Sequence, residues 1–214
     1  HQHTEVEDLV IKAGKIEAVK TSRGEIETNI VLSAVAGYTP RLLHLAGLQS
    51  PIDIYPLQAC VTEPIKPWLD TIIVSGSLHL YISQSARGEL VMGASVDPME
   101  LHNKRSTFEF VTSLSDQILD LFPFLSSVKV NRQWAGMADM TPDFAPIMGT
   151  TPVKGFFIDA GWGTWGFKAT PVSGKTMANT IAKNSNDPLI ESFNLDRFEN
   201  FRLVGEKGAA AVGH

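Results

Sequence analysis

The residues best suited to chemistry lie together in one glycine-rich loop late in the chain. An apolar run over residues 156–160 precedes the loop and a helix-forming segment follows it, which is the strand, turn and helix order of a cofactor loop. The candidate cofactor-binding residues are Gly161, Trp162, Gly163, Thr164, Trp165, Gly166, Phe167 and Lys168. Their three glycines fit the G-x-G-x-x-G spacing of a dinucleotide fingerprint, so the identity of the cofactor has to be decided from the other side chains.

A dinucleotide is a poor match for this loop. A true fingerprint needs small side chains next to the pyrophosphate, a second strand beyond the helix and an acidic residue about 20 positions further on. This loop carries Trp162 and Trp165, which indicate walls around a flat ligand. Its glycines leave backbone N–H groups available to that ligand, and Pro171 falls in the first turn of a helix whose positive end faces it. We therefore predict an anionic or electron-rich ring; a nicotinamide-dependent dehydrogenase is an alternative that rests only on the glycine spacing.

Lys168 ends the loop with an ammonium group. Its place beside two indoles and a helix N-terminus predicts an electropositive pocket suited to an anion. The alternative is a lysine that is solvated at the start of a helix.

Composition excludes several other functions. The 214 residues are 43% hydrophobic and 19% charged, with a net charge of −5 and no cluster of Lys or Arg, which argues against nucleic acid binding. The single cysteine, Cys60, excludes an internal disulfide and a thiolate metal cluster, and no histidine pairs with a carboxylate at metal-ligand spacing. No apolar run approaches the ~20 residues that cross a bilayer, and the first residues lack a signal-peptide pattern. We expect a cytoplasmic globular protein without a metal.

The elements that would position the loop come from both ends of the chain. Short strand-like runs over 6–10, 15–21 and 25–30 predict a meander, followed by a fully buried strand over 30–37 and a short helix over 40–46. This order is typical of the later part of a flavin-binding domain.

The middle of the chain has a different pattern, which predicts a separate antiparallel sheet. Its strands are expected at 55–63, 71–74, 80–84, 89–94 and 128–134. An amphipathic helix over 107–121 is expected to act as scaffold. A turn at 141–143 follows, fixed by hydrogen bonds from the Asp143 side chain to the backbone.

Five segments together resemble one family. They are Gln58–Asp70, Tyr81–Gly88, Trp134–Gly136, Thr141–Asp143 and Gly161–Lys168, and they resemble the β subunits of heterotetrameric sarcosine oxidases over essentially all 214 residues. The wider group comprises the flavin-dependent amine oxidases, including glycine oxidase and D-amino acid oxidase. The resemblance implies a mixed α/β fold with a partial FAD/NAD(P)-binding Rossmann-like domain at residues 1–50 and 135–214. It also implies an antiparallel substrate domain of D-amino acid oxidase type at 51–134.

The resemblance also implies roles for residues. The loop would line the flavin ring of FAD, and Lys168 would hold the carboxylate of an amino-acid substrate as a catalytic residue. Tyr81 would face the substrate side of the flavin, with simple packing as the alternative, and Arg132 would lie near the flavin. Val91 and Ser95 stand where monomeric relatives carry a lysine and a histidine, which puts direct reaction of this flavin with oxygen in doubt.

The implied activity is oxidation of the secondary amine sarcosine to glycine and a one-carbon unit passed to tetrahydrofolate. Electrons would pass to FMN at an interface with other subunits and then to oxygen. The adenine-dinucleotide turn, the substrate-binding arginine and the FMN-linked histidine of the family have no match here, so we expect this sequence to be the C-terminal part of a longer subunit. Two alternatives stay open: an inert fragment or assembly module that exposes the face of residues 30–36, and a related FAD enzyme acting on dimethylglycine or proline.

Overall fold

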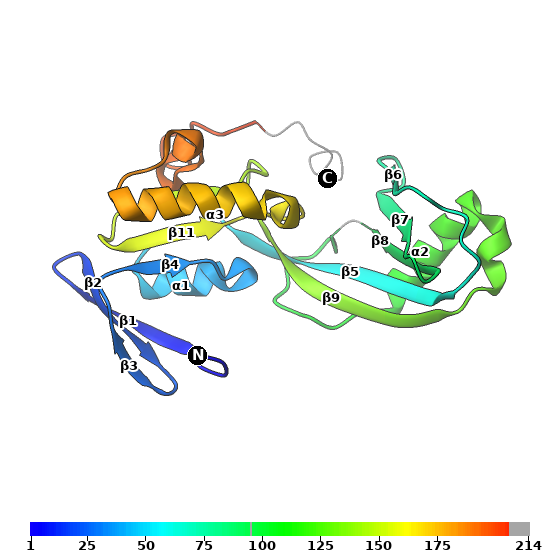
Figure 1. Ribbon diagram of the computed structural model, residues 1–214, viewed down its shortest axis with the longest axis horizontal. Helices are drawn as coiled ribbons and strands as arrows, with labels where there is room; N and C mark the ends of the chain where they lie inside the picture. Colours follow the sequence, from blue (N-terminus) through cyan, green and yellow to red (C-terminus); the bar gives the residue numbers. More distant parts are fainter. Residues whose placement is uncertain (95, 206–214) are drawn as a thin grey trace. The chain divides into compact units, whose positions relative to one another are not determined.

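A computed structural model describes residues 1–94 and 96–205. The chain forms two compact units, one built from residues 1–53 together with the described residues from 139 onward, and the other from residues 54–138. The fold is a mixed α/β arrangement with antiparallel sheets, as predicted, and Figure 1 labels its elements.

The first unit contains two three-stranded sheets. The antiparallel meander consists of β1 (Val6–Lys12), β2 (Lys15–Thr21) and β3 (Gly24–Glu27), in that order. The second sheet has the order β10-β11-β4 and consists of β10 (Ile147–Thr150), β11 (Phe156–Ala160) and β4 (Val31–Ser33). β11 is antiparallel to β10 and parallel to β4, so chain segments far apart in sequence share this sheet.

Helices flank the second sheet. The α-helices of this unit are α1 (Thr39–Leu45) and α3 (Gly166–Lys183), and its 3-10 turns are η1 (Ala36–Tyr38), η3 (Pro188–Phe193) and η4 (Leu195–Arg197). α3 lies along β11 in Figure 1. Met177 on α3 packs with Met148, Phe157 and Ile190 in a buried cluster, which fixes the helix that follows the glycine loop.

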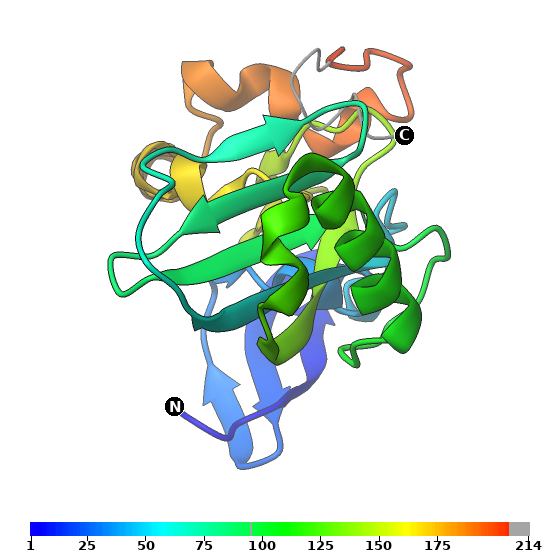
Figure 2. The same cartoon turned by 90° about the vertical axis from the view of Figure 1, so that its right-hand side faces the viewer.

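The second unit is a five-stranded sheet with one helix on it. The strand order is β6-β7-β8-β5-β9, with β5 (Asp53–Pro64), β6 (Ile73–Ser75), β7 (Leu80–Gln84), β8 (Glu89–Ala94) and β9 (Val130–Met140). α2 (Phe108–Leu121) lies across one face, as Figure 2 shows, and η2 (Pro123–Ser127) follows it. Leu80, Ile82, Leu114 and Ile118 are among the residues of the core between helix and sheet.

Two expectations from the sequence are wrong. The strand predicted over 30–37 as fully buried is only three residues long, and Leu32 at its centre is 39% exposed. In the described part of the chain β4 pairs only with β11, so its other edge is unpaired. Pro171 lies inside α3 rather than in its first turn, because the helix already begins at Gly166. Within the described residues, no helix is long and apolar enough to cross a membrane.

Candidate functional site

The glycine loop connects β11 to α3 and lies against the end of β9. Gly161 and Gly163 have φ values of +72° and +52°, which only glycine adopts without strain. A Cβ at Gly161 would lie 2.6 Å from Cγ2 of Thr141, and one at Gly163 would lie 2.9 Å from the sulfur of Met140. The glycines therefore serve close packing of the loop on the strand beneath it.

Asp139 holds the loop in this position. Its side chain is buried, and its carboxylate accepts hydrogen bonds from Gly161 N at 2.7 Å and from Gly163 N at 3.2 Å. Burial raises the pKa of Asp139, and the hydrogen bonds from loop N–H groups oppose that shift. Sequence analysis did not single out Asp139; the signal available was an acidic residue at the buried end of a strand.

These contacts correct one expectation about the loop. The N–H groups of Gly161 and Gly163 point to Asp139, and Trp165 N donates to Trp162 O at 2.9 Å. They are not available to a ligand as predicted. The N–H groups at the start of α3 remain available to a ligand. Within the described residues, no side chain at the N-cap position, Trp165, accepts a hydrogen bond from them.

The two indoles have different surroundings. Trp162 Nε1 donates to Asp159 Oδ1 at 2.6 Å, and the Ser173 hydroxyl donates to the other oxygen of Asp159. This bridge ties Trp162 to α3 and to the buried cluster beneath it. The Nε1–H of Trp165 is buried and has no hydrogen-bond partner within the described chain. An orphaned buried donor is costly, which marks Trp165 as the indole prepared to meet a polar ligand atom.

The solvent side of the loop carries the remaining predicted residues. Thr164, Phe167 and Lys168 are exposed, with Phe167 96% exposed. Lys168 lies in the first turn of α3, where its ammonium adds to the positive end of the helix dipole. A planar, electron-rich ring with carbonyl acceptors fits these groups, since the uncapped helix N-terminus and the Trp165 indole supply donors and Phe167 supplies an apolar contact.

The other predicted site residues lie in the second unit. Tyr81 on β7 is half-buried, and its ring occupies the space above Gly93, where a Cβ would come within 2.5 Å of it. Burial raises the pKa of the Tyr81 hydroxyl, with a further contribution from Cys60, so it remains a neutral phenol. Arg132 on β9 is exposed, and Val91 on β8 is half-buried. Ser95 lies outside the described residues. The structure thus keeps residues 161–168 together in the loop and the first turn of α3, and it places Tyr81 and Arg132 in a different unit.

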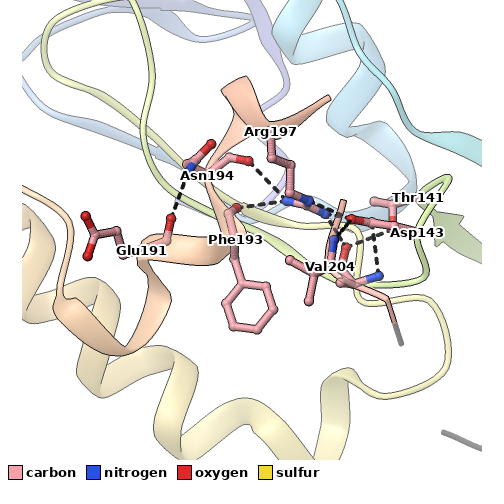
Figure 3. Close-up of polar contacts among 8 residues, drawn as sticks. Thr141, Asp143, Glu191, Phe193, Asn194, Arg197 and Val204 are labelled. Atoms are coloured by element: carbon pink, nitrogen blue, oxygen red, sulfur yellow. Dashed lines mark hydrogen bonds and ion pairs between the residues drawn. The ribbon is translucent and has the colours of Figure 1, made fainter. Parts of the chain in front are cut away.

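A buried ion pair lies in the same unit as the loop. Arg197 and Asp143 form an ion pair with an Nε–Oδ2 distance of 2.8 Å, and both side chains are almost completely buried (Figure 3). Asp143 also accepts from Ala145 N at 3.3 Å, which confirms that its side chain fixes the turn. Arg197 escaped sequence analysis because its partner is 54 residues away and nothing local marks the pair.

No group of three or more His, Cys, Asp or Glu residues in the described part of the chain is arranged to hold a metal ion. The donors gathered at the loop are backbone N–H groups, an indole and an ammonium group. They are suited to an organic ring or an anion.

The fold and this loop define a class. The family model described as FAD dependent oxidoreductase (DAO) matches residues 1–180, and the chain belongs to that family. It is 41% identical to the sarcosine oxidase subunit beta of Rhodobacter capsulatus and 40% identical to that of an Arthrobacter species, in each case over 100% of this chain. It spans about half the length of these curated relatives, 51% and 53% respectively.

Solved structures agree with this assignment. L-proline dehydrogenase from P. horikoshii is 29% identical, with a TM-score of 0.87 over 94% of this chain and 55% of that one. Glycine oxidase from Geobacillus kaustophilus is 22% identical, with a TM-score of 0.83 over 92% of this chain and 53% of that one, which shows a shared fold. The predicted family and fold class are confirmed.

Proposed function

We propose that the full-length protein to which this sequence belongs is an FAD-dependent oxidoreductase of the sarcosine oxidase β type. It oxidises sarcosine to glycine and a one-carbon unit. The supporting observation is the loop itself: glycine N–H groups fixed by Asp139, followed by an uncapped helix N-terminus with Lys168 in its first turn. When bound, FAD supplies the acceptor for the electron pair and hydrogen that leave the amine.

The chain's own residues bind and orient in this proposal. The first-turn N–H groups of α3 and the Trp165 indole would hold the electron-rich edge of the ring, where the positive helix end favours added negative charge. Lys168 would hold the substrate carboxylate by a charge-assisted hydrogen bond. Tyr81, as a neutral phenol, would offer a donor on the substrate side, and Arg132 would lie near the flavin.

The names of the relatives and the sequence resemblance support a proposal about the wider assembly. We propose that the protein works with other sarcosine oxidase subunits in the cytoplasm, that FMN at a subunit interface receives the electrons, and that tetrahydrofolate accepts the one-carbon unit. We also propose that residues 1–50 and 135–214 form part of the FAD-binding domain and residues 51–134 the substrate domain.

A specific observation favours a second substrate. The similar solved structure at 29% identity is an L-proline dehydrogenase, and proline, like sarcosine, is a secondary amino acid with a carboxylate for Lys168 to bind. Comparison of kcat/KM for sarcosine, dimethylglycine and proline decides among these substrates.

The first test is the visible absorption spectrum of the purified protein, with mass identification of any chromophore released by denaturation. Bound FAD together with bleaching by sarcosine under anaerobic conditions supports the proposal. A full-length protein that binds no FAD contradicts it and leaves the inert or assembly-module alternative. Titration with NAD tests the remaining alternative, and a saturable response without bound flavin would favour it.

A further inference from the structure

We propose that Arg197, 2% exposed and remote from the loop in sequence, is a positioning residue for the cofactor loop at residues 161–168. The inference rests on the proposed function, because it takes this loop to line FAD. Arg197 itself would touch neither cofactor nor substrate. It would act through the turn at residues 141–145 and the end of β9.

The guanidinium group of Arg197 has a hydrogen-bond acceptor for each of its N–H groups. Nε donates to Asp143 Oδ2 at 2.8 Å, and Nη2 donates to Asp143 Oδ1 at 2.9 Å and to Ala145 O at 2.8 Å (Figure 3). Nη1 donates to the carbonyl oxygens of Phe193 and Asn194 at 3.0 and 3.1 Å. All five N–H donors of the guanidinium are used, so its orientation is fixed by two chain segments at once.

The hydrogen bonds of Arg197 stabilise a strained turn at residues 141–145. Phe144, between the two residues that Arg197 contacts, has φ +56°, a left-handed conformation that is costly for an aromatic residue. Within the turn, Ala145 N donates to Asp143 Oδ1 at 3.3 Å, and Thr141 Oγ1 donates to Ala145 O at 2.8 Å. Such a conformation persists only where the surroundings over-determine it, and Arg197 supplies contacts on both sides of it.

The turn at residues 141–145, when held in this position, supports the glycine loop. The Thr141 hydroxyl shares the Ala145 carbonyl with Arg197, and its methyl group lies where a Cβ at Gly161 would come within 2.6 Å. Asp139, two residues earlier, binds the N–H groups of Gly161 and Gly163. A shift of the turn would therefore change both the surface under Gly161 and the direction of the Asp139 carboxylate, and the loop would move with them.

The test uses the full-length protein with Arg197→Met, Arg197→Lys and the double change Asp143→Leu with Arg197→Met. Arg197→Met leaves Asp143 buried without a charged partner, and Arg197→Lys keeps a charge but cannot make all five hydrogen bonds. The double change removes both charges and is expected to recover folding stability. We expect all three variants to exchange the amide hydrogens of Gly161 and Gly163 on the order of tenfold faster. We also expect FAD to bind about tenfold more weakly, an effect of the size found for residues that hold ligand-binding groups in place.

Two controls separate positioning from general stability. Arg41→Met removes an exposed arginine whose pair with Glu5 is in the same unit, and Leu9→Ala destabilises the buried side of β1. Neither should change loop exchange beyond its effect on global unfolding. The proposal is overturned if the double variant regains stability with loop exchange and FAD affinity equal to wild type, or if Leu9→Ala affects the loop as strongly as Arg197→Lys. The exchange measurement needs no cofactor, so it stands even if the protein proves to bind no FAD.

Discussion

Asp139 and Asp143 are both buried, yet their surroundings move their pKa values in opposite directions. For Asp139 burial is the largest effect, and the pKa is raised because only backbone N–H groups oppose it. For Asp143 burial also acts upward, but hydrogen bonds from Arg197 and from backbone N–H groups together outweigh it and lower the pKa. The difference comes from the full positive charge that Asp143 faces and Asp139 lacks.

We expect Asp143→Asn to remove a pH-dependent part of the folding stability. Because the folded-state pKa of Asp143 is lowered, its ionised form stabilises the folded protein above the ordinary pKa of about 3.9, and this contribution is lost as the pH falls through the folded-state pKa. At pH 7 the free energy of unfolding should fall by about 3 kcal/mol, since Arg197 is left as an uncompensated buried charge. Denaturant titrations of both proteins across the acid range measure the difference.

The comparison variant is Asp70→Asn, which changes an exposed aspartate in the second unit. The gap between wild type and Asp143→Asn should narrow as the pH falls, while Asp70→Asn follows wild type. A gap that keeps the same size at all pH values would show that ionisation of Asp143 does not contribute.

Lys168→Met should weaken substrate binding more than flavin binding. The substitution keeps much of the side-chain length and removes the charge proposed to hold the carboxylate, and a hydrogen bond to a charged group contributes about 1.5–3 kcal/mol. We therefore expect KM for sarcosine to rise by roughly 10- to 100-fold with the FAD content unchanged. Steady-state kinetics with Lys175→Met, an exposed lysine further along α3, as the matched control check this, and equal effects of the two changes would remove Lys168 from the site.

At the scale of elements, the glycines of the loop and of the helix should respond oppositely to alanine. Gly161→Ala places a Cβ 2.6 Å from Thr141 Cγ2 at a φ of +72°, whereas Gly174 lies inside α3 with no atom within 4 Å of an added Cβ. We expect Gly161→Ala to lower the free energy of unfolding by about 2 kcal/mol, of which the left-handed backbone accounts for roughly 1–2 kcal/mol. Gly174→Ala should raise it by about 0.5–1 kcal/mol.

Thermal and denaturant unfolding of the two variants measure these changes. Amide exchange at Gly163 should increase in Gly161→Ala and stay unchanged in Gly174→Ala. If Gly161→Ala were as stable as wild type, the loop would have room to move away from β9, and its fixed position could not explain cofactor binding.

Local signals were sufficient for many elements. β7 and β8 have the predicted bounds, because a polar Ala-Arg-Gly turn separates two runs of alternating residues. α2 begins one residue after Thr107, whose side chain accepts from Phe110 N and caps the helix. β11, the loop and α3 also follow in the predicted order, since glycine and apolar residues mark the changes of structure within a few positions.

Features that depend on distant partners were not predictable in this way. The apolar run at 30–37 indicates burial, but the burial of its side chains depends on which distant segments pack on the faces of β4, and Leu32 is left 39% exposed. Pro171 is compatible with a first helical turn, yet its place in α3 is set by where the loop ends at Gly166. Likewise, the sequence predicts glycine N–H groups for a ligand, and only the fold shows that Asp139 takes two of them.

At the scale of the whole molecule, the apolar surface around β4 sets how the chain behaves alone. Ile30, Leu32 and Val35 are 47%, 39% and 39% exposed, and Tyr38 is 50% exposed. This exposure contradicts the fully buried strand predicted over 30–37 and matches the alternative expectation, a fragment or assembly module that exposes the face of residues 30–36. Since β4 is at the edge of its sheet, apolar side chains and an open strand edge occur together, which is a surface prone to association.

We therefore expect the 214-residue chain on its own to self-associate through this surface. A single charged substitution in the surface should weaken the association. Leu32→Glu puts a carboxylate at the centre of the surface and should shift the sedimentation coefficient toward that of a monomer. Val74→Glu, at an equally apolar but separate position in the second unit with 65% exposure, should leave the distribution unchanged. Sedimentation velocity over a range of concentrations measures both. A wild-type chain that sediments as a monomer throughout would show that the surface is too small to bind a second copy, and equal effects of the two substitutions would show that net charge, rather than this face, controls association.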